Sequence, residues 1–300
     1  MGGTSRHRLG AHMSIGGGFE RAVDRARSID ATALQIFVKS ARQWDARPID
    51  PDAAARFRRR AAAAGLEQRT MAHASYLINP ASAEPAVRRR SLAALADELE
   101  RCQALAVPYL VLHPGSHGGR GVEDGLLSLV DALDHVLSRP RRSRGKAAPG
   151  PPPTILLENT AGQGATLGRR LEELAFVLDR CRFADRLGIC FDTCHALAAG
   201  YEFRDARSYR ATFDSIDRSV GLHRLCGFHL NDSKHPLGSR RDRHEHVGRG
   251  QVGLEAFRLL LNDPRFADVP MVLETPKGPD LAEDRVNLEV LRAMLPVARR

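Results

Sequence analysis

The segment from Phe228 to Gly250, FHLNDSKHPLGSRRDRHEHVGRG, concentrates side chains that bind metals, with four His, two Asp and one Glu. Within it, Asp242 and His244 are two positions apart, so in an extended backbone they point to the same side. A carboxylate and an imidazole presented together suit a metal ion. His246 lies two positions further along on that side and is an alternative to His244. The competing interpretation is a solvated polar loop in an Arg-rich protein.

The rest of the chain must position these side chains, and it alternates short apolar runs with longer amphipathic stretches. This pattern is typical of β–α units around a parallel sheet. The predicted strands are Leu9–His12, Ala33–Phe37, Arg69–His73, Tyr109–His113, Thr154–Glu158, Leu187–Asp192, Leu225–Leu230 and Pro270–Glu274. The predicted helices are Gly18–Ile29, Pro51–Ala64, Pro85–Leu105, Val122–Ser138, Leu167–Cys181, Tyr209–Val220, Leu254–Leu261 and Leu281–Leu295. Eight such units predict an α/β fold, a TIM (β/α)8 barrel forming one domain over residues 1–300.

Seven of the eight predicted strand ends carry an imidazole or a carboxylate. In chain order the end residues are His12, Phe37, His73, His113, Glu158, Asp192, His229 and Glu274. Asp and Glu together number 36 and His 12 among 300 residues, so chance would place far fewer of them at these positions. Barrel enzymes build their active sites at the C-terminal ends of the strands. The strand ends therefore predict a shared polar pocket at the barrel mouth.

Collecting these residues, and adding His195 from the FDTCH motif at the end of the sixth predicted strand, gives nine candidate ligands, five imidazoles and four carboxylates. They are His73, His113, Glu158, Asp192, His195, His229, Asp242, His244 and Glu274. This mixed set suits zinc or manganese, and nine ligands exceed what one ion uses, which predicts two or three ions. Clustered divalent ions stabilise the attacking and leaving oxygens of a phosphoryl centre. Phosphodiester hydrolysis is the reaction that most needs such a set.

The motifs around these residues resemble endonuclease IV, the zinc-dependent apurinic/apyrimidinic endonuclease family. They are GAHMS, HASYLIN, HPGSH, ENTAGQG, DTCHALAAGY, HLNDSK, DRH and LETP, and they span nearly the whole chain. The resemblance implies a TIM barrel with three zinc ions, in which Glu158 and Glu274 are catalytic as well as ligands. The implied ligand sets are His73, His113 and Glu158 for the first ion; Glu158, Asp192, His229 and Glu274 for the second; and His195, Asp242 and His244 for the third.

The resemblance also implies a substrate, damaged double-stranded DNA. The family takes part in base excision repair: it cuts the backbone 5′ to an abasic site, leaves a 3′-hydroxyl and a 5′-deoxyribose phosphate, and trims blocked 3′ ends. Family members flip the abasic nucleotide out of the duplex and fill the gap with side chains. The matching positions here are Arg42, Tyr76 and Leu77. Without the resemblance, Tyr76 and Leu77 would be read as core residues.

Composition agrees with a polyanionic partner, with a formal charge of +9 and a pI near 9.9. Only four of the 45 basic residues are lysines, so part of this excess reflects a general preference for Arg. No apolar run is long enough to span a bilayer and no signal-peptide pattern begins the chain. The five scattered cysteines suit reduced thiols. We therefore expect a cytoplasmic protein with no membrane contact, and by family precedent a monomer.

One segment, 139–153, departs from the barrel pattern because it is rich in Pro, Gly and basic residues. It is predicted to be a flexible insert on the side of the barrel opposite the site. A phosphate-contacting arm is the alternative for this segment.

Two other functions compete with the nuclease. A xylose-isomerase-like sugar isomerase or epimerase would use a similar barrel mouth, but it would need fewer His ligands and no exposed Tyr76 and Leu77. A DNA-binding structural protein would explain the charge but not nine candidate ligands.

Overall fold

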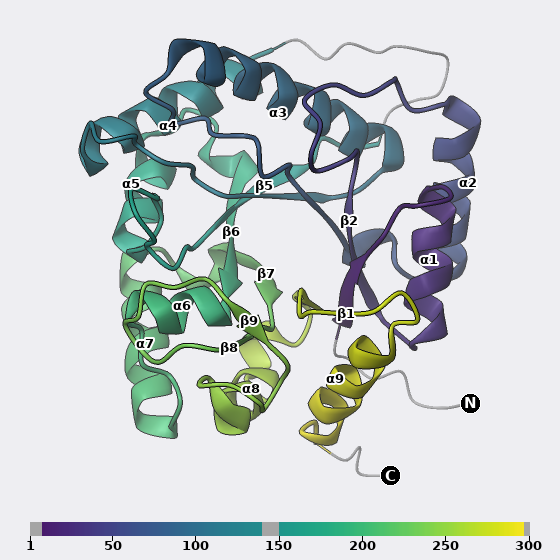
Figure 1. The fold of residues 1–300 in the computed structure, drawn as a ribbon, viewed down its shortest axis with the longest axis vertical. Coiled ribbons are helices and arrows are strands. Elements are labelled where there is room, and N and C mark those ends of the chain that lie inside the picture. The colour runs from purple at the N-terminus through teal and green to yellow at the C-terminus, as the bar shows by residue number, and fades with distance from the viewer. Residues whose placement is uncertain (1–7, 140–149, 297–300) are drawn as a thin grey trace.

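The computed structural model describes residues 8–139 and 150–296, and within them eight parallel strands close into a barrel (Figure 1). The strands are β1 (Arg8–Met13), β2 (Ala33–Phe37), β3 (Thr70–His73), β4 (Tyr109–Leu112), β5 (Thr154–Glu158), β6 (Leu187–Asp192), β7 (Leu225–His229) and β10 (Pro270–Leu273). Their hydrogen-bonded order is β1-β10-β7-β6-β5-β4-β3-β2, closing back on β1. The predicted TIM barrel is confirmed.

Helices cover the outside of this barrel (Figure 1). They are α1 (Phe19–Ser28), α2 (Pro51–Ala63), α3 (Pro85–Leu105), α4 (Val122–Leu137), α5 (Leu171–Arg180), α7 (Ala206–Ser219), α8 (Gly253–Leu261) and α9 (Ala282–Ala293). A further short helix, α6 (Thr193–Ala199), follows β6 directly and is buried at the barrel mouth. Short 3-10 turns at Glu67–Arg69, Ala184–Arg186, Leu222–Arg224 and Pro264–Phe266 lead into β3, β6, β7 and β10. Among the described residues, no helix combines the length and apolar character needed to cross a bilayer.

Most predicted elements differ from the observed ones by up to three residues at an end; helix α7, for example, begins at Ala206 rather than Tyr209, and β4 and β10 end one residue before His113 and Glu274. Three differences are larger. Helix α6 was not predicted, because seven residues are too few to show a helical period. Helix α5 begins at Leu171 rather than Leu167, since Gly168 has a φ of +82°, which a helix cannot contain. A small antiparallel hairpin, β8 (Asp232–Ser233) and β9 (His244–Glu245), was also missed.

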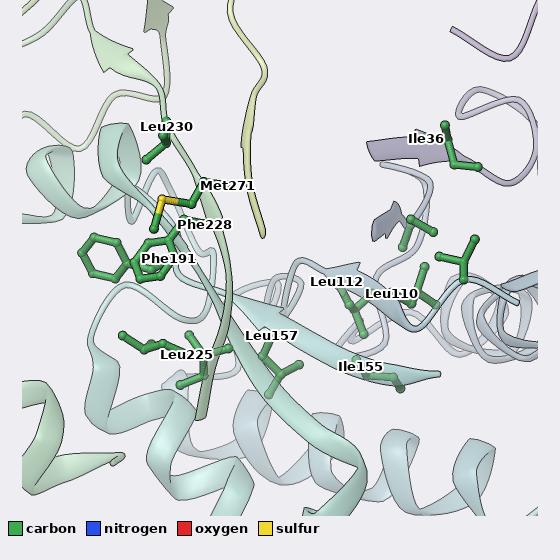
Figure 2. Close-up of a cluster of buried hydrophobic side chains, with 14 of the residues drawn as sticks. Ile36, Leu110, Leu112, Ile155, Leu157, Phe191, Leu225, Phe228, Leu230 and Met271 are labelled. Atoms are coloured by element: carbon green, nitrogen blue, oxygen red, sulfur yellow. The ribbon is translucent and has the colours of Figure 1, made fainter. Parts of the chain in front are cut away.

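Alternation along the strands produces two separate apolar regions. Side chains that point outward form the larger region, in which Figure 2 shows Phe191 of β6, Phe228 of β7 and Met271 of β10 gathered together. Phe191 also contacts Phe213 of helix α7, with ring centres 5.6 Å apart. Side chains that point inward form a small apolar layer inside the barrel: Ala33, Met71, Val111, Leu156, Cys190 and Val272. The next inward position on each of these strands lies nearer the C-terminal mouth.

The predicted insert 139–153 is described only at its ends. Residues 140–149, which carry most of its charge, lie outside the described part of the chain. At the far end, Gly150 exchanges hydrogen bonds with Gln103 on α3, from its N–H to the Gln103 carbonyl (3.1 Å) and from the Gln103 amide to its own carbonyl (3.0 Å). The Pro153 carbonyl accepts from Arg186 (3.1 Å). The end of the segment is therefore attached to the barrel before β5 begins.

Candidate metal centre

The period of the strands places the polar residues of the site. Two positions after each member of the inner apolar layer, the side chain again points inward, at the mouth. His12 and His229 occupy the equivalent positions on β1 and β7, two residues after a glycine in each strand. The full set is His12, Gln35, His73, His113, Glu158, Asp192, His229 and Glu274. The polar site therefore rests directly on the apolar layer that fills the barrel.

Glu158, fully buried at the end of β5, is the central residue of this layer. Its Oε2 lies 2.9 Å from His113 Nε2 and 3.3 Å from His73 Nε2. Its Oε1 lies 2.9 Å from His229 Nδ1. The two oxygens of one carboxylate thus face two different groups of imidazoles, which is the arrangement a bridging ligand requires.

Two groups of donor atoms share this carboxylate. His73, His113 and Glu158 present donor atoms within 4.8 Å of one another, and so do Glu158, Asp192, His229 and Glu274. Glu274 Oε2 lies 3.3 Å and Asp192 Oδ2 3.8 Å from His229 Nδ1. The first two ligand sets implied by the sequence resemblance are therefore brought together.

Helix α6 places His195. Asp192, the last residue of β6, caps this helix by accepting the His195 backbone N–H on Oδ1 (2.7 Å). The left-handed Gly200 ends the helix one turn later, at φ +108°. The cap directs the His195 imidazole into the site, with Nε2 3.2 Å from Asp242 Oδ2. Asp192 thus has a structural role in addition to its candidate ligand role.

The loop between β7 and α8 brings Asp242 and His244 over the mouth. At its base the buried carboxylate of Asp232 accepts backbone N–H groups from Gly248 (2.9 Å) and Val252 (2.7 Å). The β8–β9 hairpin pairs Ser233 with His244. Asp242 Oδ1 lies 3.4 Å from His244 Nε2. Clamping both ends of a long polar loop gives these two side chains a fixed position.

The third predicted set, His195, Asp242 and His244, is less compact than the other two. Asp242 contacts the imidazoles of both His195 and His244, but the three residues do not form one group of donor atoms within 4.8 Å of one another. Their donor atoms fall instead into two groups that share His244. These groups are Asp192 with His195 and His244, and Cys194 with Asp242 and His244. Burial raises the pKa of the Cys194 thiol to about 12, so the thiolate that would bind a metal is disfavoured.

The geometry also separates His244 from His246, which the sequence left as alternatives. His246 Nδ1 accepts a hydrogen bond from Asn287 Nδ2 on α9 (3.1 Å) and belongs to none of the donor groups among the described residues. The chain turns after β9, so the two imidazoles do not share one face as an extended strand would predict.

Backbone carbonyls fix which nitrogen of three imidazoles can bind a metal. His73, His195 and His244 each donate from Nδ1 to a carbonyl oxygen, of Ala74 (2.8 Å), Asn159 (3.0 Å) and Glu274 (3.2 Å) respectively. A carbonyl can only accept, so Nδ1 carries the proton and Nε2 keeps its lone pair for a metal. His244 Nε2 is buried without a hydrogen-bond partner among the residues that the structure describes, which fits a metal ligand.

Three amides that the sequence analysis missed support the ligands. Gln35 accepts from His229 Nε2 (2.9 Å) and donates to Glu274 Oε1 (2.6 Å), which leaves His229 Nδ1 free to face Glu158. Asn231 donates to Asp192 Oδ2 (2.6 Å) and accepts from the Glu274 backbone N–H (2.8 Å). Asn159 holds the backbone of Asp192 through two hydrogen bonds of 2.7 and 3.1 Å.

The imidazoles of the site have a larger effect than burial on the pKa values of its carboxylates. Burial alone would raise the pKa of Glu158 and Glu274, but the surrounding imidazoles, His229 foremost, hold both pKa values well below their usual range. Burial also acts to raise the pKa of Asp242, yet the imidazoles of His195 and His244 beside it lower it to about 2. Ionised carboxylates this buried need cationic partners. Divalent metal ions fit that requirement, and the N/O donor set suits zinc.

The predicted DNA-contacting residues lie on two loops at the mouth. Tyr76 is 67 % exposed, the highest value among the large hydrophobic side chains that the structure describes as exposed, and Leu77 is half-buried. The Tyr76 ring centre lies 5.6 Å from that of His73 and 6.4 Å from that of His113, so it stands over the donor groups. Arg42 is exposed on the loop between β2 and α2. Tyr76 is therefore not a core residue.

Comparison with known proteins places this chain in a family. Residues 23–294 match the family model described as a xylose isomerase-like TIM barrel. A probable endonuclease 4 of Chloroflexus aurantiacus is 51% identical over 288 residues, 96% of this chain and 98% of that protein. One from Geobacter sp. strain M21 is 45% identical over 287 residues, with the same coverage. The crystal structure of endonuclease IV from Thermus thermophilus superposes with a TM-score of 0.80 at 41% identity, covering 96% of this chain and 98% of that one. The chain belongs to the endonuclease IV family.

Proposed function

We propose that this protein is a zinc-dependent DNA repair endonuclease. It hydrolyses the phosphodiester 5′ to an abasic site in duplex DNA, leaving a 3′-hydroxyl and a 5′-deoxyribose phosphate, and it removes blocking groups from 3′ ends. The observation that carries the proposal is the position of Glu158, whose two oxygens face separate groups of imidazoles 2.9 Å away on either side. Family membership supports the choice of a nuclease.

Three ligand sets would hold the metal ions. His73, His113 and Glu158 hold the first; Glu158, Asp192, His229 and Glu274 the second; and His195, Asp242 and His244 the third. When bound, such ions activate water and stabilise negative charge on phosphate oxygens. Glu158 and Glu274 stay ionised because the imidazoles around them lower their pKa values. The carboxylates therefore remain available as anionic ligands at neutral pH.

The surface around the mouth suits a duplex. Four exposed arginines, Arg240, Arg241, Arg243 and Arg249, lie on the same loop that carries Asp242 and His244. Exposed guanidinium groups attract phosphates without reading base sequence. Arg42, Tyr76 and Leu77 approach from the opposite loops and enter the stack at the lesion. Recognition then depends on the missing base rather than on neighbouring sequence.

A supercoiled plasmid carrying abasic sites tests the proposal. We expect the protein to convert it to the nicked form, to lose this activity in chelator, and to leave an undamaged plasmid intact. Nicking of both plasmids would indicate a non-specific nuclease. No nicking, together with isomerisation or epimerisation of a sugar, would favour the xylose-isomerase-like alternative.

Metal content gives a second prediction. Elemental analysis of the purified protein is expected to find about three equivalents of zinc per chain, because the nine side chains supply three sets of ligands with one bridging carboxylate. One equivalent in a fully active preparation would contradict the assignment. Manganese in place of part of the zinc would preserve the ligand sets and change only the metal.

Gln35 provides a third prediction. Gln35→Leu removes the acceptor that sets the His229 tautomer and the donor to Glu274, so we expect zinc affinity to fall by about 10–100-fold with the fold retained. Competition with a chelator measures the affinity, and circular dichroism checks the fold. Gln68→Leu, at an exposed position before β3, is the matched control. Equal zinc affinity in the two variants would show that Gln35 does not support the metal ligands.

A further inference from the structure

A buried ion pair lies under the two loops that carry the DNA-contacting residues. Lys39 follows β2 and Glu98 lies in α3, and the side chain of each is only 1% exposed. The Lys39 Nζ is 3.4 Å from Glu98 Oε1 and 3.2 Å from Asp97 Oδ2. Neither Lys39 nor Glu98 belongs to the metal-donor groups found among the described residues.

Lys39 and its neighbours on α3 hold the loop between β2 and α2 by its carbonyl groups. Lys39 donates to the Trp44 carbonyl (2.9 Å). Arg101, one turn along α3 from Asp97, donates to the carbonyls of Ala46 (2.9 Å) and Arg47 (2.8 Å). This loop, which carries Arg42, runs beside α3 (Figure 1). Charged side chains therefore hold its carbonyl groups, while Trp44 and Ile49 of the same loop pack against the core.

Glu98 holds the other loop, between β3 and α3. Both of its oxygens accept the backbone N–H of Ser75 at 3.3 Å. The Ser75 hydroxyl donates to the Ala41 carbonyl (2.7 Å) and accepts the Leu77 N–H (3.3 Å). The Ser75 hydroxyl therefore joins Ala41, the residue before Arg42, to Leu77, the residue after Tyr76. Through Lys39 and Glu98, one face of α3 holds both loops.

A buried ion pair of this kind is weak evidence of a stabilising role, so its presence calls for another explanation. Replacing such a pair with apolar residues of similar size is often neutral or stabilising, because desolvation offsets the attraction. Burial raises the pKa of Glu98 to about 7 in spite of the neighbouring Lys39, which indicates how costly the buried charge is. The pair does provide directional contacts to both loops, and an apolar pair could not make them.

We propose that Lys39 and Glu98 are positioning residues for lesion recognition. The pair fixes the separation of Arg42 from Tyr76 and Leu77, so that side chains from both loops enter the duplex at one abasic site in a single geometry. The inference rests on the proposed function, and it explains how the two loops are held in the geometry that recognises an abasic site. Neither residue touches the reacting atoms.

The test compares the double variant Lys39→Met/Glu98→Leu with the wild type on a duplex containing one abasic site. We expect zinc content to be unchanged and Tm to stay within a few degrees, because the apolar pair fills the same space. KM should rise about tenfold with kcat changed less than about threefold. The control variant Arg56→Met/Glu20→Leu removes a partly exposed ion pair between α1 and α2 and should leave KM unchanged.

A spectroscopic measurement separates positioning from a structural role. With a non-hydrolysable linkage on the 5′ side of the abasic site, binding of the zinc-loaded protein to a duplex with 2-aminopurine opposite that site should raise its fluorescence in the wild type, because the stack is opened. The double variant, at saturating protein, should give a smaller rise. Glu98→Gln, which keeps the shape and an acceptor for Ser75 but removes the charge paired with Lys39, should show a smaller change in the same direction if the double variant fails to fold.

The outcomes distinguish this inference from the function on which it rests. A wild type that does not incise abasic DNA overturns both. A wild type that incises, together with variants whose KM and fluorescence rise match it, overturns only the positioning role. Variants that lose zinc and kcat together also overturn it, because the pair would then act through the metal centre.

Discussion

Replacing Glu158 with Gln is expected to lower the rate of abasic-site incision by at least about 10²–10³-fold, the largest effect of any single substitution in the site. An amide of the same shape cannot be an anionic ligand to two ions, and it leaves the four nearby imidazoles without their shared counter-charge. Elemental analysis should find zinc lost from the first two sets. Single-turnover incision of a labelled abasic duplex measures the rate.

The matched control is Glu100→Gln, an exposed carboxylate on α3. It removes the same charge far from the donor groups and should leave rate and zinc content unchanged. Incision at the wild-type rate in the Glu158 variant would show that this carboxylate is not part of the metal centre.

The double variant Tyr76→Ala/Leu77→Ala is expected to weaken incision of an internal abasic site by about 10–100-fold, because each contact with the open stack contributes to holding it apart. Zinc content and Tm should stay close to wild type, since Tyr76 is 67 % exposed. Removal of a blocking group at a 3′ end should fall less, because a frayed end opens more easily. Both activities are measured on the same preparation.

An exposed apolar pair elsewhere provides the control. Val122→Ala/Leu127→Ala removes two exposed side chains of α4 and should affect neither activity. Loss of zinc or unfolding of the Tyr76 and Leu77 variant would identify the two residues as core. An equal fall in both activities, with zinc retained, would assign them to general DNA binding instead of nucleotide flipping.

Strand periodicity accounts for most of what the sequence predicted. Glu158 and Asp192 end apolar strands, and parallel strands bring their C-terminal ends to one mouth, so these side chains could be placed together without coordinates. Gln35 was missed because Phe37 was taken as the residue at the end of β2. A polar side chain two positions after Ala33, inside an otherwise apolar strand, was the signal available.

Features that depend on turns could not be predicted in this way. Two-residue periodicity places His244 and His246 on one side, but the chain turns after β9 and His246 contacts Asn287. Helix α6 is too short to show a period, although an Asp cap at its start and Gly200 at its end mark its limits. The Lys39–Glu98 pair joins residues 59 positions apart, and a contact between such distant residues leaves no pattern in the local sequence.

The most direct test of the central claim maps the ends produced from a labelled duplex with one abasic site. We expect a single cut on the 5′ side of the lesion that leaves a 3′-hydroxyl a polymerase can extend, with activity lost in chelator and restored by added zinc. A cut on the 3′ side that leaves an unsaturated aldehyde, or a cut that persists in chelator, would contradict a zinc-dependent hydrolysis at this site.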